Sequence, residues 1–162
     1  MTSVRVAAID ASNWTSAINV RVTPEQVRFV TTHEPVGLLI LAKAHVHPDG
    51  REWEAVAFVD DAGSVVGVTA LAHDDEQCEI RHFAIDAGHQ GRGVGYLAMT
   101  AVIEHVQRSR PLCHQLMLTV HPDNGRAQRL YSRAGLIHDG AYREGQPIFT
   151  LALGRAPDVN RT

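Results

Sequence analysis

Three glycines alternate with other residues in the segment Gln90-Gly91-Arg92-Gly93-Val94-Gly95, and this segment restricts the fold more than any other. The residues before it, Cys78–Asp86, have the composition of a strand. After it, apolar residues recur at the spacing of a helix, at Leu97, Ala101, Val102 and Val106. The chain is therefore expected to make a strand, a tight glycine-rich turn and a helix in direct succession.

The remaining segments predict a single mixed α/β domain over residues 1–154, followed by a polar tail at 155–162. Acidic turns separate three successive strands, which are expected to be antiparallel, at Glu54–Val59, Ser64–Leu71 and Cys78–Asp86. Before them we expect a strand at Val4–Ile9 and helices at Trp14–Val20 and Val36–His45. Between these two helices, a further helix is expected to begin at Thr23-Pro24-Glu25-Gln26. After them we expect helix, strand, helix and strand, at Val94–Gln107, Leu116–Val120, Gly125–Ala134 and Ile148–Leu153.

Composition excludes several classes of protein. With 162 residues and 44% hydrophobic side chains, the chain suits one domain with a sizeable core. No apolar run approaches the roughly 20 residues of a membrane helix, and the N-terminus lacks a signal-peptide pattern, so the expected location is the cytoplasm. A net charge of −3 argues weakly against nucleic acid as a partner.

Neither the histidines nor the cysteines predict a metal site. Among 10 histidines the one tight cluster is His45 and His47 with Asp49, and a solvated turn is the favoured interpretation of it. Cys78 and Cys113 match no metal spacing and are expected to be reduced thiols in the core.

The glycine turn is suited to bind an anion. Alternating glycines leave backbone N–H groups unshielded at the start of a helix, where the helix dipole favours negative charge. A diphosphate fits such a turn, with Arg92 at its rim. A dinucleotide fingerprint would need glycine at Tyr96, and the Lys-Ser/Thr pair of a P-loop is absent. From the turn alone, a loop that binds nothing remains the alternative.

Two motifs together resemble the GNAT N-acetyltransferase superfamily. Gln90–Gly95 is similar to its Gln/Arg-x-x-Gly-x-Gly/Ala loop, and Glu79–Asp86 to its central strand. Downstream, Asn124–Leu136 resembles the signature Asn-x-x-Ala-x-x-Leu-Tyr-x-x-x-Gly-Phe, with Leu136 in place of the final Phe. The resemblance implies the GNAT fold, a mostly antiparallel, splayed mixed sheet flanked by helices, and acetyl-coenzyme A as acetyl donor.

The resemblance also implies roles for individual residues. The expected cofactor-binding residues are Phe83, Ala84 and Ile85 for the pantetheine arm, Gln90, Gly91, Arg92, Gly93, Val94 and Gly95 for the pyrophosphate, and Asn124 and Tyr131. Tyr131 is the expected general acid. Glu79 is the expected general base, with a pKa raised by partial burial, and Glu54 or His82 is the alternative. A nucleophilic Cys78 or Cys113 remains a formal alternative to direct transfer.

A fainter likeness concerns the acceptor. Val22–Gln26 with Phe29-Val30 resembles bacterial polyamine N-acetyltransferases, which implies transfer of acetyl to a primary amine such as a polyamine or diamine. The acidic residues expected to attract that cation are Glu52, Glu54, Asp74, Asp75 and Glu76. Protein amines and an aminoglycoside are alternative acceptors, and a non-catalytic acyl-coenzyme A sensor is the alternative outside enzymes. A homodimer is expected by analogy with the family.

Overall fold

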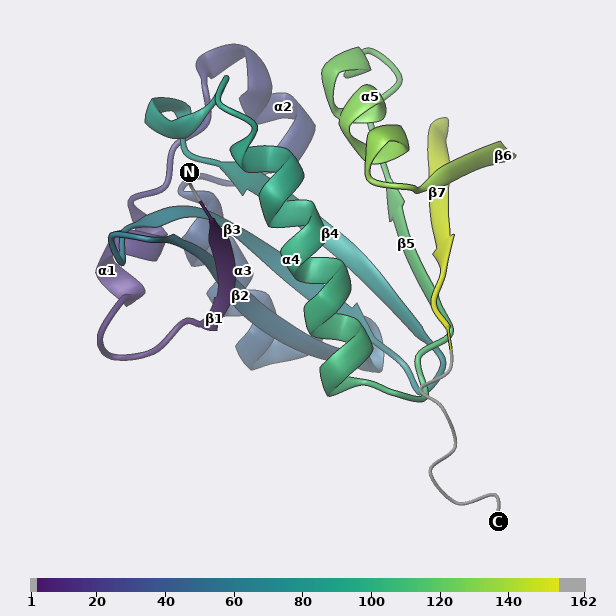
Figure 1. The fold of residues 1–162 in the computed structure, drawn as a ribbon, viewed down its shortest axis with the longest axis horizontal. Coiled ribbons are helices and arrows are strands. Elements are labelled where there is room, and N and C mark those ends of the chain that lie inside the picture. The colour runs from purple at the N-terminus through teal and green to yellow at the C-terminus, as the bar shows by residue number, and fades with distance from the viewer. Residues whose placement is uncertain (1–2, 155–162) are drawn as a thin grey trace.

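A computed structural model describes residues 3–154 of the chain. Its strands are β1 (Val4–Ala8), β2 (Glu52–Asp60), β3 (Val65–His73), β4 (Gln77–Ile85), β5 (Gln115–Thr119), β6 (Ile137–Arg143) and β7 (Gln146–Ala152). Its α-helices are α1 (Trp14–Ile18), α2 (Val27–Val30), α3 (Val36–Val46), α4 (Val94–Ser109) and α5 (Gly125–Arg133). Short 3₁₀ turns lie at Pro24–Gln26, Pro48–Gly50 and Ala87–His89. Figure 1 shows these elements gathered around one sheet.

The seven strands form one sheet in the order β1-β2-β3-β4-β5-β7-β6. Its strands pair antiparallel except for β4 and β5, which are parallel. The β4–β5 pairing covers only Gln77–Glu79 against Gln115–Met117, although both strands continue. The two strands therefore diverge beyond Glu79, and Figure 1 shows their ribbons parting there. The mixed, mostly antiparallel and splayed sheet predicted from the sequence is confirmed.

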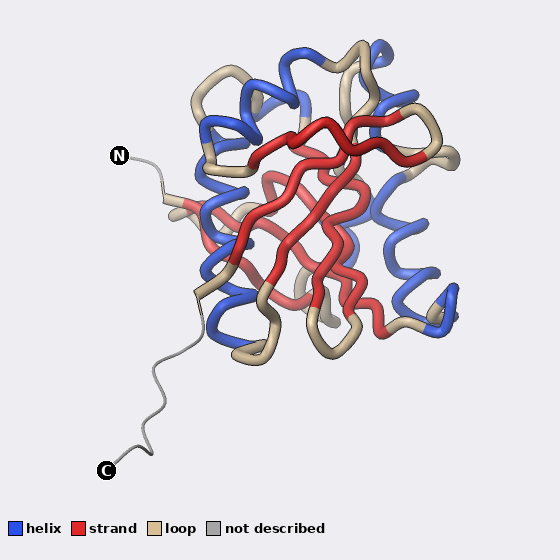
Figure 2. Tube along the Cα trace, turned by 90° about the vertical axis from the view of Figure 1, so that its right-hand side faces the viewer, coloured by secondary structure: helices blue, strands red, loops and turns tan. Residues whose placement is uncertain are grey.

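Helices cover both faces of the sheet, as Figure 2 shows. On one face α4 packs over a core that includes Phe58, Leu71, Met99 and Leu116. On the other face α1 and α3 pack over Ala17, Ile40, Trp53, Ala70 and their neighbours. Burying each large aliphatic or aromatic side chain of these cores contributes about 1.5–3 kcal/mol. Ile80 joins the first core but Ala84 joins the second, although they are four residues apart, because a β-bulge between them shifts the alternation of β4 by one residue.

The structure adds one strand that the sequence analysis does not delimit. Residues of β6 are mostly exposed, so they lack the apolar alternation by which strands are recognised. The β6–β7 hairpin turns through Glu144 and Gly145, both with positive φ (52° and 77°), as a two-residue hairpin loop requires. The expected helix after Thr23 is also shorter than expected, a 3₁₀ turn followed by the four-residue α2.

Three further expectations concern the ends and the cysteines. Cys78 and Cys113 are both buried and free, as expected. The expected polar tail at 155–162 lies outside the described residues, so the domain boundary at 154 stays a prediction.

Candidate active site

A cleft of about 230 Å³ opens between β4 and β5 where the two strands part. Ile80 and the β4 residues from His82 to Ile85 line one side, and Leu118 to Val120 line the other. The glycine turn and α4 close one end, while α2 and α5 form the walls. The cleft thus joins a helix N-terminus to the gap between two strands.

The glycine turn has the backbone geometry of an anion cradle. Gly91 and Gly93 have φ values of 82° and 77°, which side-chain-bearing residues rarely adopt. A Cβ atom at either position would meet nothing within 4 Å, so the space above the turn is open. The 16-residue α4 begins at Val94, so its first N–H groups have no partner within the helix and point towards this space. Free N–H groups and a helix dipole fit a diphosphate.

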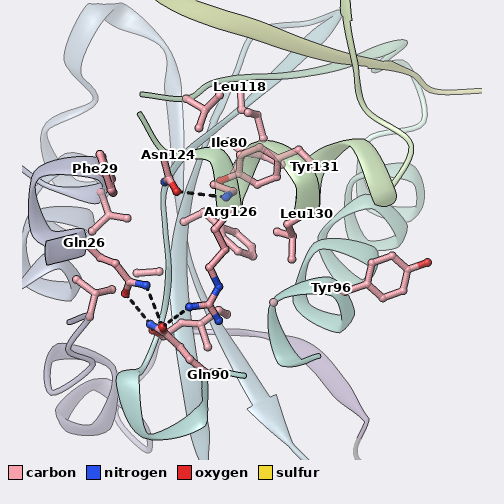
Figure 3. Close-up of a pocket in the computed structure, with 18 of the residues that line it drawn as sticks. Gln26, Phe29, Ile80, Gln90, Tyr96, Leu118, Asn124, Arg126, Leu130 and Tyr131 are labelled. Atoms are coloured by element: carbon pink, nitrogen blue, oxygen red, sulfur yellow. Dashed lines mark hydrogen bonds between the residues drawn. The ribbon is translucent and has the colours of Figure 1, made fainter. Parts of the chain in front are cut away.

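Two glutamines and an arginine close the cleft beside the turn, as Figure 3 shows. The side-chain amides of Gln26 and Gln90 donate to one another, over 2.8 and 3.0 Å, and Gln90 also donates to the Ile85 carbonyl. Arg126 from α5 donates to the Gln90 amide oxygen at 3.4 Å. Gln90 therefore ties together α5, β4 and the segment before α2.

The expected and observed arginines of this region differ. Arg92 does not line the cleft, and its guanidinium donates to the Gly88 carbonyl at 3.1 Å. Arg126 does line it, although the sequence analysis did not single it out. Its place two residues after Asn124, in the first turn of the motif's helix, was the available signal. A cation at this position can neutralise a phosphate held over the turn.

A β-bulge interrupts β4 at the wall of the cleft. Val68 pairs with Ala84, but Ala70 pairs with Arg81, so His82 and Phe83 lie opposite one residue of β3. His82 has a φ of 55°, and the extra residue of a bulge is left without a ladder partner. The expected pantetheine residues Phe83, Ala84 and Ile85 all line the cleft here. The bulge thus presents backbone N–H and C=O groups next to the cleft.

Tyr131 lines the deeper part of the cleft, near Ile80 and Leu118 in Figure 3. Its ring packs edge-on against Phe83 and Phe149, with centroids 6.3 and 6.1 Å away. Its hydroxyl makes no hydrogen bond with any side chain or backbone group of residues 3–154. Burial raises the pKa of the Tyr131 phenol above its ordinary value, so the hydroxyl keeps its proton at neutral pH.

Asn124 is the N-cap of α5. Its side-chain oxygen accepts a hydrogen bond from the Ala127 N–H at 3.2 Å, and the residue also lines the cleft. The cap satisfies one of the helix's orphan donors. The capping role that was expected alongside cofactor binding is therefore present.

Glu79 differs from the expectation for a general base. Its side chain is 1% exposed and does not line the cleft. Burial opposes its ionisation, but hydrogen bonds from Arg143 and Arg51 outweigh burial and lower the pKa of Glu79. Arg81 donates to the same carboxylate at 3.2 Å. The expected rise in pKa is wrong, because three guanidinium groups surround the carboxylate and stabilise its charged form.

The two alternative bases lie in different places. Glu54 accepts hydrogen bonds from His105 at 2.8 Å and His73 at 3.2 Å, and it does not line the cleft. Burial opposes its ionisation, but these bonds lower the pKa of Glu54 to about 2. His82 does line the cleft. Burial and the nearby Lys43 lower the pKa of His82 to about 4, so its imidazole is neutral at physiological pH.

The acidic residues expected to attract a cation lie away from the cleft. None of the set lines it: Glu52, Glu54, Asp74, Asp75 and Glu76. Glu52 instead pairs with Arg110 at 2.9 Å, and Asp74 accepts backbone N–H groups within its own turn. Burial raises the pKa of the Cys78 thiol, which argues against a nucleophilic role.

Comparison with known families agrees with this geometry. The model of the acetyltransferase (GNAT) family matches residues 18–136. The chain belongs to the GNAT acetyltransferase family. It is therefore an acetyl-coenzyme A-dependent N-acetyltransferase, and the cleft with its glycine turn fits the coenzyme A of this family. No curated protein sequence matches the chain.

Solved structures share the fold at low identity. Spermidine N-acetyltransferase from Vibrio cholerae, in complex with coenzyme A and spermine, is 16% identical with a TM-score of 0.70, over 94% of this chain and 97% of that chain. The ribosomal-protein-S5-alanine acetyltransferase of Vibrio fischeri is 17% identical with a TM-score of 0.67, over 92% of both chains. AAC(6')-Ib in complex with paromomycin and acetyl-coenzyme A is 17% identical with a TM-score of 0.71, over 94% of both chains. Their acceptors differ, so the shared fold leaves the acceptor of this chain open.

The described residues hold neither a helix that could span a membrane nor a cluster that could hold a metal ion. In residues 3–154 no helix has the length and apolarity to traverse a bilayer. The same part of the chain contains no group of three or more His, Cys, Asp or Glu side chains arranged to hold a metal ion.

Proposed function

We propose that this GNAT enzyme transfers the acetyl group of acetyl-coenzyme A to a primary amine directly, within a ternary complex. The observation that supports this proposal is the continuity of the cleft. It runs from the open N-terminus of α4 at Gly93, past the bulge in β4, to the hydroxyl of Tyr131. A diphosphate and a thioester at the two ends of one extended molecule would fit such a path.

Acetyl-coenzyme A supplies the thioester that is cleaved. The amine nitrogen forms a bond to the carbonyl carbon, the carbon–sulfur bond breaks, and the sulfur takes up one proton while the amine loses one. The backbone N–H groups freed by the bulge at His82 and Phe83 would stabilise the charge that develops on the carbonyl oxygen. Tyr131 would donate the proton to the departing sulfur, because its raised pKa keeps its hydroxyl protonated.

For the amine's proton, His82 is the better-supported acceptor among the three candidates. It lines the cleft and is unprotonated, as a general base must be. Its Nδ1 lies 2.7 Å from the Val30 carbonyl and its Nε2 2.7 Å from the Lys43 amine, so Lys43 must release Nε2 before that nitrogen can take the proton. Glu79 and Glu54 are ionised, but neither lines the cleft, and their oxygens accept several hydrogen bonds. Glu79 as base stays a prediction that the arrangement of its three arginines does not favour.

Three narrower predictions rest on the family likeness alone. These are a polyamine acceptor, a homodimer and a cytoplasmic location. The similar Vibrio cholerae enzyme is a spermidine N-acetyltransferase, whereas the Vibrio fischeri enzyme is a ribosomal-protein-S5-alanine acetyltransferase. An acceptor on a protein or an aminoglycoside therefore remains an alternative.

The proposal is tested by binding and turnover with the same protein. Calorimetry should detect coenzyme A binding, and Arg126→Gln should weaken it by about 10-fold because one charge-assisted contact is lost. Arg5→Gln, on the exposed β1, is the matched control. Release of free thiol from acetyl-coenzyme A with a broad amine panel then separates enzyme from sensor. Binding without thiol release from any amine would favour the sensor, and absence of coenzyme A binding would overturn the proposal.

A further inference from the structure

The face of β4 opposite α4 carries an excess of positive charge. Glu79 and Arg81 alternate with Ile80, which belongs to the α4 core, so both lie on the α3 face. Arg51, the residue before β2, reaches Glu79 at 2.8 Å, and Arg143 reaches it from the β6–β7 hairpin. We call Arg51, Arg81 and Arg143 with Glu79 the arginine cluster.

Glu79 does not saturate the arginine cluster. A carboxylate accepts about four hydrogen bonds, whereas each guanidinium has about five donors. Arg51 uses two of its nitrogens, on Glu79 and on the Ala72 carbonyl, and its Nε is buried without any partner. Arg81 and Arg143 are about a third exposed or more, with side-chain exposures of 35% and 41%. Their unused donors are therefore open to a second oxyanion.

A fourth cation extends the positive charge to the cleft. The Lys43 amine on α3 lies 2.7 Å from Nε2 of His82, which lines the cleft. Burial lowers the pKa of Lys43 most, and the charge of nearby Arg81 lowers it further. The charge of Asp49 raises it. Four basic side chains thus face two carboxylates, Glu79 and Asp49, which leaves an excess of two positive charges.

The arginine cluster lies beside the cleft rather than in its lining, on the face from which we expect an acceptor to approach. β4 and β5 part directly after Glu79 and Met117, so the cluster borders the start of the cleft. α4, which begins at the diphosphate cradle, lies on the other face of the sheet from α3, as Figure 1 shows. A second substrate entering from the α3 face would therefore meet Arg81, Arg143 and Lys43 before the thioester.

We propose that the acceptor is a primary amine that also carries an oxyanion, a carboxylate or a phosphonate-like group, bound by the arginine cluster. This inference rests on the proposed function and narrows its substrate class. The excess of positive charge repels a polyamine, whereas a bidentate guanidinium matches an oxyanion. The same positive charge favours the neutral, nucleophilic form of the acceptor's amino group, because it disfavours a nearby ammonium.

The test compares four amines of equal chain length with the whole protein. At the non-reacting end, 4-aminobutyrate carries a carboxylate and 4-aminobutylphosphonate a phosphonate. Butylamine is neutral there and putrescine is cationic. We expect kcat/KM, measured by thiol release, to be about 10-fold higher for at least one oxyanionic amine than for butylamine, and lower for putrescine than for butylamine. The better oxyanion identifies the group. Arg143→Gln should bring the ratio of oxyanionic to neutral amine close to one, while the exposed Arg5→Gln leaves that ratio unchanged.

The outcomes separate this inference from the proposed function. The inference is overturned if putrescine or butylamine releases as much thiol as both oxyanionic amines, or more. The proposed acetyltransferase function would be unaffected by that result. An unchanged ratio in a folded Arg143→Gln protein, with the melting temperature as check, would also overturn it. If no amine releases thiol, each amine is titrated into the coenzyme A complex by calorimetry. The inference is overturned if neither oxyanionic amine binds more tightly than butylamine. Loss of coenzyme A binding itself would instead remove the proposed function.

Discussion

Tyr131 combines burial, a protonated hydroxyl and access to the cleft in a single side chain. Phe83 and Phe149 hold its ring from two sides, so the hydroxyl has little freedom to turn away. The hydroxyl has no hydrogen-bond partner within residues 3–154, so its proton is available to a group bound in the cleft. This arrangement suits a proton donor for a departing sulfur.

Replacing Tyr131 by Phe should lower kcat by about 10²-fold or more, because the donor is lost while the ring packing is kept. The dissociation constant for coenzyme A should change by less than about 3-fold, since the lost hydroxyl contributes at most one neutral hydrogen bond. Thiol-release assays measure kcat, and calorimetry measures the dissociation constant. Tyr142→Phe, at an exposed position of β6, is the matched control. An undiminished kcat in Tyr131→Phe would remove this residue from the chemistry.

His82 gives a prediction about pH. Its folded pKa of about 4 lies below its ordinary value of 6.5, so the neutral imidazole persists at every pH above about 4. If His82 accepts the amine's proton, His82→Gln lowers kcat/KM by about 10²-fold. The ratio of wild-type to variant kcat/KM, in which the acceptor's own ionisation cancels, should stay level from pH 8 to 5 and fall only towards pH 4. A fall centred near pH 6.5 would show that the imidazole is not held neutral by burial.

At the scale of elements, the spacing between α4 and α5 depends on Gly95. A Cβ atom there would lie 3.1 Å from Cδ1 of Leu130, tighter than ordinary contact. The glycine lets α5 approach the first turn of α4, which brings Arg126 and Asn124 to the same cleft as the diphosphate cradle. Gly95 therefore serves packing, whereas Gly91 and Gly93 serve backbone conformation.

Gly95→Val should destabilise the fold by about 1–3 kcal/mol through overpacking against Leu130. It should also weaken coenzyme A binding, because α5 must move away from the turn. Urea unfolding and calorimetry report the two effects. Gln107→Val introduces the same side chain at an exposed site of α4. It should leave coenzyme A binding unchanged and lower the free energy of unfolding by only a few tenths of a kcal/mol, through helix propensity. Equal stability of the two variants would mean that α5 tolerates the added volume.

At the scale of the whole molecule, Glu54 joins three elements on the α4 side. It accepts hydrogen bonds from His73 of β3 and His105 of α4, so one carboxylate of β2 links the sheet to its main helix. On the opposite face Glu79 of β4 pairs with Arg51, just before β2, with Arg81 of β4 and with Arg143 of β6. Each face of the sheet thus holds one ionised glutamate whose partners come from distant parts of the chain.

Acid should therefore destabilise the protein through Glu54. Its folded pKa of about 2 lies below the ordinary 4.5, so its contribution is complete above pH 4.5 and is lost as pH falls towards 2. The shift corresponds to up to about 3 kcal/mol. Urea unfolding at pH 5 and pH 3 should show a smaller loss for Glu54→Gln than for the wild type. Glu25→Gln, at an exposed site, should behave as the wild type, and an equal loss in all three proteins would exclude Glu54 as the cause.

Local signals in the sequence sufficed for the order of elements and for much of the candidate site. The glycine turn, Asn124 as a cap and Tyr131 on its helix depend on residues within a few positions of one another, and periodicity and motifs record such relations. β6 escaped prediction because its exposed residues carry no apolar pattern. Arg126 escaped because a basic residue in a first helical turn has no distinctive neighbours.

The sequence by itself determined that this chain makes a strand, a glycine turn and a helix of the GNAT type. The tertiary structure alone decided the surroundings of Glu79. Arg143 is 64 positions away in the chain, yet the β6–β7 hairpin brings it to the Glu79 carboxylate. Backbone conformation follows from neighbouring residues, whereas the charge around a buried group is summed over space and depends on how distant strands come together. For that reason the two sequence motifs together predicted coenzyme A, whereas the oxyanionic acceptor that we propose rests on the folded sheet.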